Sequence, residues 1–254
     1  MVTITLTMKL ASRMRTTAPT SIMMAPATCD LCIRQTISGR YLFLSPGRFT
    51  FPSKFDAFSG LDFFNSSYLS TPPWDIGHPQ REFVRLADAG EVKGDVIDLG
   101  CGTGENAMML AAKGNRVLGI DSAPLAIAKA RKKAEERRST AEFEVANALE
   151  LQALGRTFDS AIDCGLFHTF SDRQRKVFSV SLMRALRPGG RYFMLCFSDD
   201  EPADWGGPRR VSKEEIVETF RQEWRIDSTK PARFEAAGRG EGGRAWLASL
   251  TRLA

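Results

Sequence analysis

Short apolar runs alternate with amphipathic segments from about Phe63 to the C-terminus. Such runs are typical of buried strands, and apolar residues at helical spacing are typical of helices that cover a sheet. We expect strands at Asp95–Leu99, Arg116–Asp121, Ala141–Asn147, Phe158–Asp163, Arg191–Phe197, Trp224–Lys230 and Arg244–Leu253. We expect helices at Pro79–Gly90, Glu105–Lys113, Pro124–Arg138 and Asp172–Leu186, and a further helix that opens at Ser212.

This alternation predicts an α/β fold, with a doubly wound, seven-stranded, mostly parallel sheet and helices on both faces. Only a short glycine-rich link, residues 238–243, joins the last two strands, and it has no room for a crossover helix. We therefore expect the last strand to be antiparallel. Ser171 is the expected N-cap of one helix, and Ser212–Glu215 has the sequence of a capping box for the next.

The first 55 residues have a different composition. They are rich in Thr, Ser, Met and Arg and show no sustained hydrophobic periodicity. Their net charge is +6, whereas that of the whole chain is +5. Residues 56–254 therefore have a net charge of −1, which gives no indication that this part binds nucleic acid. We expect a disordered or loosely attached extension over 1–55, and one folded domain over 56–254 whose first part, 56–90, forms a cap. The alternative is a transit peptide, which would make the protein mitochondrial.

Several absences narrow the class of protein. No apolar run approaches the roughly 18 residues of a membrane helix, so no membrane partner is expected. Five scattered cysteines fit a reducing, cytoplasmic setting. Cys29 and Cys32 form a C-x-x-C pair, but there is no second pair, and His78 and His168 are the only histidines. No metal site is expected.

The sequence VIDLGCGTGENA, Val96–Ala107, is the main candidate site. A P-loop would need a lysine and a Ser/Thr after the last glycine, and neither is present. A dinucleotide loop reads G-x-G-x-x-G, whereas here G-x-G-x-G follows Asp98. A carboxylate at that place would repel a pyrophosphate, and it favours a ligand that carries an amino group and a positive centre.

With Asp121 at the end of the next strand (VLGID), this sequence resembles the class I S-adenosylmethionine-dependent methyltransferases, as does PGGRYFMLCF further on. The resemblance covers roughly residues 63–253 and implies a Rossmann-like fold with S-adenosylmethionine as the cofactor. It implies cofactor-binding residues at Trp74, Asp98, Gly100, Cys101, Gly102, Gly104, Asp121, Ser122, Asn147, Ala148, Asp163 and Cys164.

In these families the acid and glycines of the loop hold the methionine part of the cofactor, which here means Asp98 and Gly100–Gly104. Asp121 would accept hydrogen bonds from the ribose hydroxyls. Asn147 stands where the family often has Asp, and would meet the adenine amino group. Asp163 would line the site beside the transferred methyl group.

The sequence STPPWDIGHPQ resembles a segment of the thiopurine, thiol and halide methyltransferases and related bacterial small-molecule enzymes. In that group Trp74 would pack near the sulfonium; alternatively it anchors the cap. The resemblance implies in-line transfer to a small-molecule thiol or similar soft nucleophile, with a small-molecule O-methyltransferase as the alternative. Nucleobase methylation is not expected, because [DN]-P-P-[YFW] is missing after the fourth strand.

A general base is optional, since a thiol is partly ionised at neutral pH. If one is used, His168 is the candidate, with Asp163 nearby; alternatively His168 is only packed. Cys164 is expected to pack rather than act as a nucleophile. We expect the acidic loop Ser198–Pro208, with Trp205, to be a lid over the acceptor.

Two other functions remain open: a nicotinamide-dependent oxidoreductase, and a cofactor-binding protein without activity. The sequence does not define the oligomeric state, and a monomer is the default expectation.

Overall fold

The computed structural model describes residues 63–202, 204 and 206–254. The extension over residues 1–55, with Cys29 and Cys32, lies outside the described residues, as do residues 56–62 of the cap and Trp205 of the expected lid.

One seven-stranded sheet organises the domain, in the order β3-β2-β1-β4-β5-β7-β6. Strands β1 to β5 pair in parallel, and β7 runs antiparallel to both β5 and β6. The expected fold class, including the antiparallel last strand, is confirmed. The strands are β1 (Asp95–Leu99), β2 (Arg116–Asp121), β3 (Glu142–Val145), β4 (Phe158–Cys164), β5 (Leu186–Phe197), β6 (Trp224–Phe234) and β7 (Gly243–Arg252).

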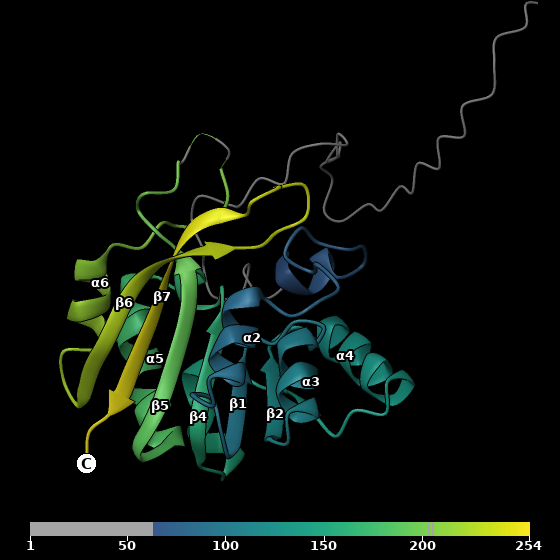
Figure 1. Cartoon of the computed structure of the whole chain (residues 1–254), viewed down its shortest axis with the longest axis horizontal. Coiled ribbons are helices and arrows are strands. Elements are labelled where there is room, and N and C mark those ends of the chain that lie inside the picture. Colours follow the sequence, from purple (N-terminus) through teal and green to yellow (C-terminus); the bar gives the residue numbers. More distant parts are fainter. Residues whose placement is uncertain (1–62, 203, 205) are drawn as a thin grey trace, which may run out of the picture. The chain divides into compact units, whose positions relative to one another are not determined.

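Helices cover both faces of this sheet (Figure 1). Helices α2, α3 and α4 pack on one face, and α5, α6 and the short helix η1 pack on the other. The helices are α2 (Arg81–Asp88), α3 (Glu105–Ala112), α4 (Pro124–Glu136), α5 (Asp172–Ala185) and α6 (Lys213–Thr219), with 3₁₀ helices η1 (Ala148–Leu154) and η2 (Phe167–Thr169). Residues 63–67 are also helical. Ser171 and Ser212 both form the expected capping boxes.

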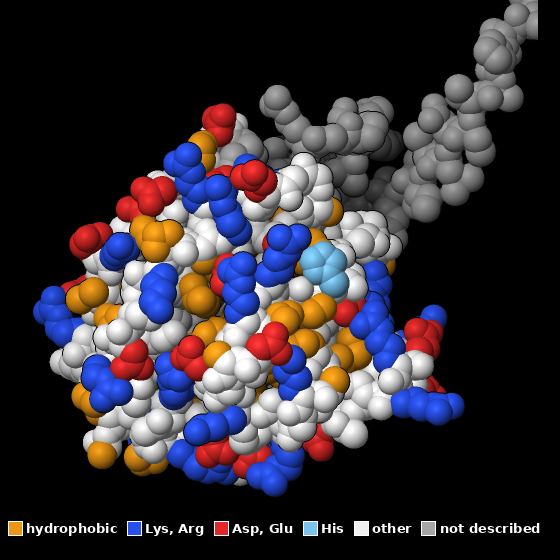
Figure 2. Space-filling view, viewed as in Figure 1, with side chains coloured by type: hydrophobic (Ala, Val, Ile, Leu, Met, Phe, Trp, Pro, Cys, Tyr) orange, Lys and Arg blue, Asp and Glu red, His pale blue; other side chains and the backbone are white. Residues whose placement is uncertain are grey.

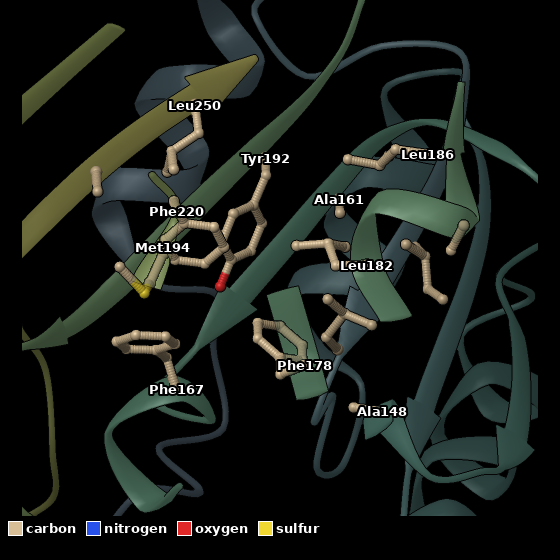
Figure 3. Close-up of a cluster of buried hydrophobic side chains, with 14 of the residues drawn as sticks. Ala148, Ala161, Phe167, Phe178, Leu182, Leu186, Tyr192, Met194, Phe220 and Leu250 are labelled. Carbon is tan, nitrogen blue, oxygen red and sulfur yellow. The ribbon is translucent and has the colours of Figure 1, made fainter. Parts of the chain in front are cut away.

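The two cores follow from the alternation of side chains along the central strands. In β5, Tyr192 and Met194 point into the core under α5, whereas Phe193 and Leu195 point into the core under α3. Figure 3 shows Tyr192 and Met194 packed with Phe167, Phe178 and Phe220 on the α5 side.

Two strands, β5 and β6, extend well beyond the ranges that the sequence predicts. Strand β5 begins at Leu186, before the Arg-Pro-Gly-Gly turn, because Leu186 pairs with Phe158 ahead of a register shift. Strand β6 continues through Pro231 to Phe234. A proline, which lacks an N–H, is tolerated there because β6 is the edge of the sheet.

On the face shown in Figure 2, basic and acidic side chains are interspersed. No helix in the described part of the chain is long and apolar enough to cross a membrane. Nor do the described residues contain a group of three or more His, Cys, Asp and Glu side chains placed to hold a metal ion.

Phe143 sets the distance between the sheet and the start of α3. It pairs with Gly119 across β2 and β3, where a Cβ on Gly119 would lie 2.7 Å from the Phe143 ring. A Cβ on Gly104, the N-cap of α3, would lie 2.5 Å from the same ring. The ring therefore fills the space that both glycines leave, and the first turn of α3 comes close to β2.

We expect Gly119→Ala to lower the free energy of unfolding by about 1–3 kcal/mol, because the added methyl group overpacks against Phe143. Gly119 does not have a positive φ, so backbone strain does not confound the test. Urea unfolding measures the loss. In a Phe143→Leu background the same substitution should cost less; an equal loss in both backgrounds would show that Phe143 is not the obstacle.

Candidate functional site

The glycine loop lies at the carboxyl edge of the parallel strands, where ligands bind in such sheets. Gly100, Gly102 and Gly104 all have positive φ, at 66°, 55° and 86°. The Cys101 N–H donates to the carbonyl of Ile120 at 2.9 Å, which fixes the loop against the end of β2. The sequence therefore forms a tight turn, held against β2, in which three positions carry no side chain.

Asp98 is a buried carboxylate within β1, just before this loop, and only 1% of it is exposed. Neither carboxylate oxygen has a hydrogen-bond partner among the described residues. Burial raises its pKa to about 8, and the charge of Asp163 adds to the rise. The nearby Ala107 N–H lowers the pKa, but it is not placed to form a hydrogen bond with the carboxylate. A ligand that brings an ammonium group would supply the missing partner.

Asp121 lies across the loop from Asp98, at the end of β2. One oxygen accepts the Gly102 N–H at 3.0 Å and the other accepts the Ala123 N–H at 2.8 Å, so the side chain ties the loop to the start of α4. Burial raises the pKa of Asp121. Each oxygen retains a lone pair for a ribose hydroxyl, and Asp121 and Ser122 are both partly exposed.

Asn147 and Ala148 follow β3, next to Asp121: the Ala146 N–H donates to the Asp121 carbonyl at 3.1 Å. The Asn147 side-chain oxygen accepts the Leu149 N–H at 3.0 Å and caps η1. Its amide is exposed and Ala148 is buried. The amide that the sequence assigned to adenine therefore also has a local structural role.

Asp163, at the end of β4, is fully buried and uses both oxygens within the protein. It accepts the Leu166 N–H at 2.7 Å, the Phe167 N–H at 3.0 Å and the Tyr192 hydroxyl at 2.9 Å. Burial raises its pKa to about 7. These bonds shape the turn into η2. Burial also raises the pKa of the neighbouring Cys164 thiol, in keeping with a packing role.

His168, in η2, is enclosed by aromatic rings. It stacks on Phe197 at 5.2 Å between centroids, and Phe234 lies 5.8 Å away. Its Nδ1 accepts the Phe197 N–H at 3.2 Å, so the neutral ring carries its proton on Nε2. Burial lowers its pKa to about 3, and the charges of Arg175 and Arg210 contribute. This environment opposes proton uptake, which a general base requires.

Two aromatic residues of the cap, Tyr68 and Trp74, pack near the glycine loop and the start of α4. The Trp74 Nε1–H donates to the Tyr68 hydroxyl at 3.0 Å, and both rings pack on Ala123 and Ala126 at the start of α4. Trp74 therefore anchors the cap, and Tyr68, which the sequence analysis did not select, is the residue that approaches the loop.

Polar contacts fasten the same cap to the loop. The Thr103 hydroxyl donates to Asp75 at 2.6 Å and accepts from the ammonium of Lys133 at 2.7 Å. Lys133 also binds Glu105 at 2.8 Å. Asp75 of the P-W-D-x-G segment is thus joined to the glycine loop and to α4.

A second set of hydrogen bonds joins the cap to the link between β6 and β7. The side-chain amide of Gln80 donates to the Glu235 carbonyl at 2.8 Å and accepts the Glu235 N–H at 2.9 Å. The Gln80 N–H donates to Asn106 of α3 at 3.0 Å. Because Gln80 makes these bonds from an extended backbone, α2 begins at Arg81 and not at Pro79. No local sequence signal marks this long-range pair.

From the raised pKa of Asp98 we predict how the stability of the ligand-free protein depends on pH. A carboxyl whose pKa rises from about 3.9 in the unfolded chain to about 8 in the fold destabilises the fold increasingly across that pH window. Asp98→Asn should therefore stabilise the protein, by a margin that is small near pH 4 and grows towards pH 8 by at most about 1.4 kcal/mol per pH unit. Urea unfolding at pH 5 to 8 checks this; a margin independent of pH would contradict it.

Comparisons with known proteins agree with this geometry. A methyltransferase-domain family matches residues 96–190. A 2-heptyl-1-hydroxyquinolin-4(1H)-one methyltransferase of Mycobacteroides abscessus is 38% identical over 189 residues, which cover 70% of this chain and 83% of the relative.

Two solved structures extend the comparison. A protein solved for the conversion of a disulfide bond into a thioacetal group during echinomycin biosynthesis is 33% identical, with a TM-score of 0.70 over 76% of this chain and 91% of that one. The magnesium protoporphyrin IX methyltransferase of Synechocystis, with S-adenosylmethionine bound, shares the fold at 18% identity, with a TM-score of 0.60 over 80% of this chain and 100% of that one.

The unpartnered Asp98 carboxylate, the glycines of the loop and the Asp121 oxygens fit the ammonium and ribose groups of this cofactor. The chain belongs to the class I S-adenosylmethionine-dependent methyltransferases that act on small molecules, and S-adenosylmethionine is its cofactor.

Proposed function

We propose that the acceptor reaches the site already ionised, as the oxyanion of an N-hydroxylated heteroaromatic molecule or as a thiolate. The observation that carries this proposal is the state of the two acid–base candidates at the end of β4. Asp163 uses both oxygens in hydrogen bonds to the protein, and His168 has its Nδ1 occupied and its pKa held at about 3. Neither is placed to remove a proton from an acceptor.

The relatives support both acceptor classes. The Mycobacteroides relative is named for a 1-hydroxyquinolinone, whose N-hydroxyl group is acidic, and it is aligned over 83% of its length. We therefore put an oxygen acceptor of this type first. The thiolate is the second candidate, because the structure at 33% identity is associated with chemistry at a disulfide.

The geometry suits a transfer that needs alignment more than acid–base chemistry. S-adenosylmethionine supplies a methyl group activated by a positive sulfonium. The rings of His168, Phe197 and Phe234 close the space beyond β4, and a Cβ on Gly165 would lie 2.9 Å from the Phe234 ring. These apolar walls would exclude water and hold a flat acceptor in line with the methyl group.

A panel of acceptors tests the proposal. At pH 7 we expect kcat/KM to follow the anionic fraction of the acceptor. An N-hydroxyquinolinone and an aromatic thiol should react at least about tenfold faster than a phenol of similar size, because a phenol with pKa near 10 is almost wholly protonated. Release of S-adenosylhomocysteine is the measurement. Equal rates for acidic and non-acidic acceptors would refute the proposal, and the ratio between the two acidic acceptors decides between oxygen and sulfur.

His168→Asn tests the absence of a base at this position. The Asn side-chain oxygen can still accept the Phe197 N–H, so we expect kcat within about tenfold of the parent and an unchanged pH profile between pH 6 and 8. With an N-hydroxyquinolinone acceptor, loss of an ascending limb of the pH profile in the variant would show instead that His168 acts as a base.

A further inference from the structure

The hydroxyl group of Tyr68 lies directly above the middle glycine of the loop. A Cβ on Gly102 would be only 2.8 Å from the Tyr68 oxygen, so any side chain at Gly102 would displace the hydroxyl. Tyr68 is 4% exposed, and the Gly102 N–H below it donates to Asp121. The hydroxyl is thus buried at the surface of the loop that receives the cofactor.

The direction of the Tyr68 O–H bond follows from its partner. The indole N–H of Trp74 can only donate, so the Tyr68 oxygen is the acceptor in their 3.0 Å hydrogen bond. The proton of Tyr68 therefore remains to be donated. Among the described residues nothing accepts it, and a buried donor left without an acceptor is unfavourable.

The surroundings keep Tyr68 in its donor form. Burial raises the pKa of Tyr68 well above its usual value, and the negative charge of Asp121 adds to the rise. The Lys129 ammonium lies 5.9 Å from the centre of the Tyr68 ring and places a positive charge on the same side of the loop. The raised pKa keeps the hydroxyl protonated, and the Lys129 ammonium favours an anionic acceptor for its proton.

The charges around the loop indicate which group of the cofactor accepts the hydroxyl proton of Tyr68. The methionine part carries an ammonium group and a carboxylate, and the buried Asp98 carboxylate is the partner of the ammonium. The carboxylate must then face away from Asp98, towards hydrogen-bond donors. We propose that Tyr68 is a cofactor-binding residue whose hydroxyl donates a hydrogen bond to the methionine carboxylate of S-adenosylmethionine.

The test compares two ligands that differ in the amino-acid part, which carries this carboxylate together with the ammonium group. S-adenosylhomocysteine has the amino-acid part, whereas 5′-methylthioadenosine keeps adenine, ribose and a thioether but lacks it. Measured by calorimetry, Tyr68→Phe should lower the affinity for S-adenosylhomocysteine by about tenfold and leave the affinity for 5′-methylthioadenosine unchanged. Binding is the readout, so the result does not depend on identifying the acceptor.

Two further variants make the test specific. Tyr192→Phe also removes a tyrosine hydroxyl, but that hydroxyl binds Asp163, so the ratio of the two affinities should stay at the parent value. Trp74→Phe keeps a ring and removes the N–H that orients Tyr68, so it should shift the ratio in the same direction as Tyr68→Phe, by a smaller factor. It also serves as the test if Tyr68→Phe proves unstable by circular dichroism.

If Tyr68→Phe lowers the affinity for both ligands equally, the hydroxyl contacts the nucleoside part, and the carboxylate assignment is overturned. Unchanged affinity for both ligands would overturn the role of Tyr68 altogether. Neither result bears on the proposed acceptor, which the acceptor panel tests separately.

Discussion

The site depends on one buried group without a partner among the described residues, the carboxyl of Asp98. It is buried at the end of a central strand, under the first turn of α3, and neither of its oxygens has a hydrogen-bond partner in the described structure. An isolated buried carboxylate is unfavourable and shifts its pKa rather than remain charged. The fold tolerates this because the surrounding strands are anchored in two apolar cores. A ligand with an ammonium group would supply the missing partner, and the destabilisation of the empty protein would then add to its affinity for that ligand.

The cap is held from two directions, and this determines how the ligand is enclosed. Asp75 binds Thr103 of the glycine loop, while Gln80 binds the backbone of Glu235 beyond β6. Residues from both ends of the domain therefore meet above the same strand edge. Tyr68 and Trp74 precede these contacts in the chain, and their hydrogen bond gives the Tyr68 hydroxyl a defined position over Gly102.

The acid–base residues near the end of β4 serve the architecture. Asp163 organises the turn into η2, and His168 completes an aromatic wall with Phe197 and Phe234. Under the proposed transfer to an anion, methylation by a sulfonium removes charge, and apolar surroundings would favour it without a proton acceptor. Such a reaction would be compatible with two residues that are fully used in packing and hydrogen bonding.

The sequence by itself determined the sheet, its direction and the loop. The alternation of apolar runs, the capping boxes at Ser171 and Ser212, and the acid–glycine sequence from Asp98 to Gly104 are local signals, and local backbone preferences and burial decide them. The resemblance of the P-W-D-x-G segment also predicted a place near the cofactor for Trp74, which stays a prediction.

Tertiary structure alone decided which side chains are available to a ligand. Whether Asp163 and His168 are free depends on Tyr192 and the Phe197 backbone, which come from another strand. The pairing of Gln80 with Glu235 and the approach of Tyr68 to Gly102 join residues far apart in the chain. Such contacts leave no periodicity or motif in the sequence, because they are set by how the packed elements meet and not by the preferences of any one segment.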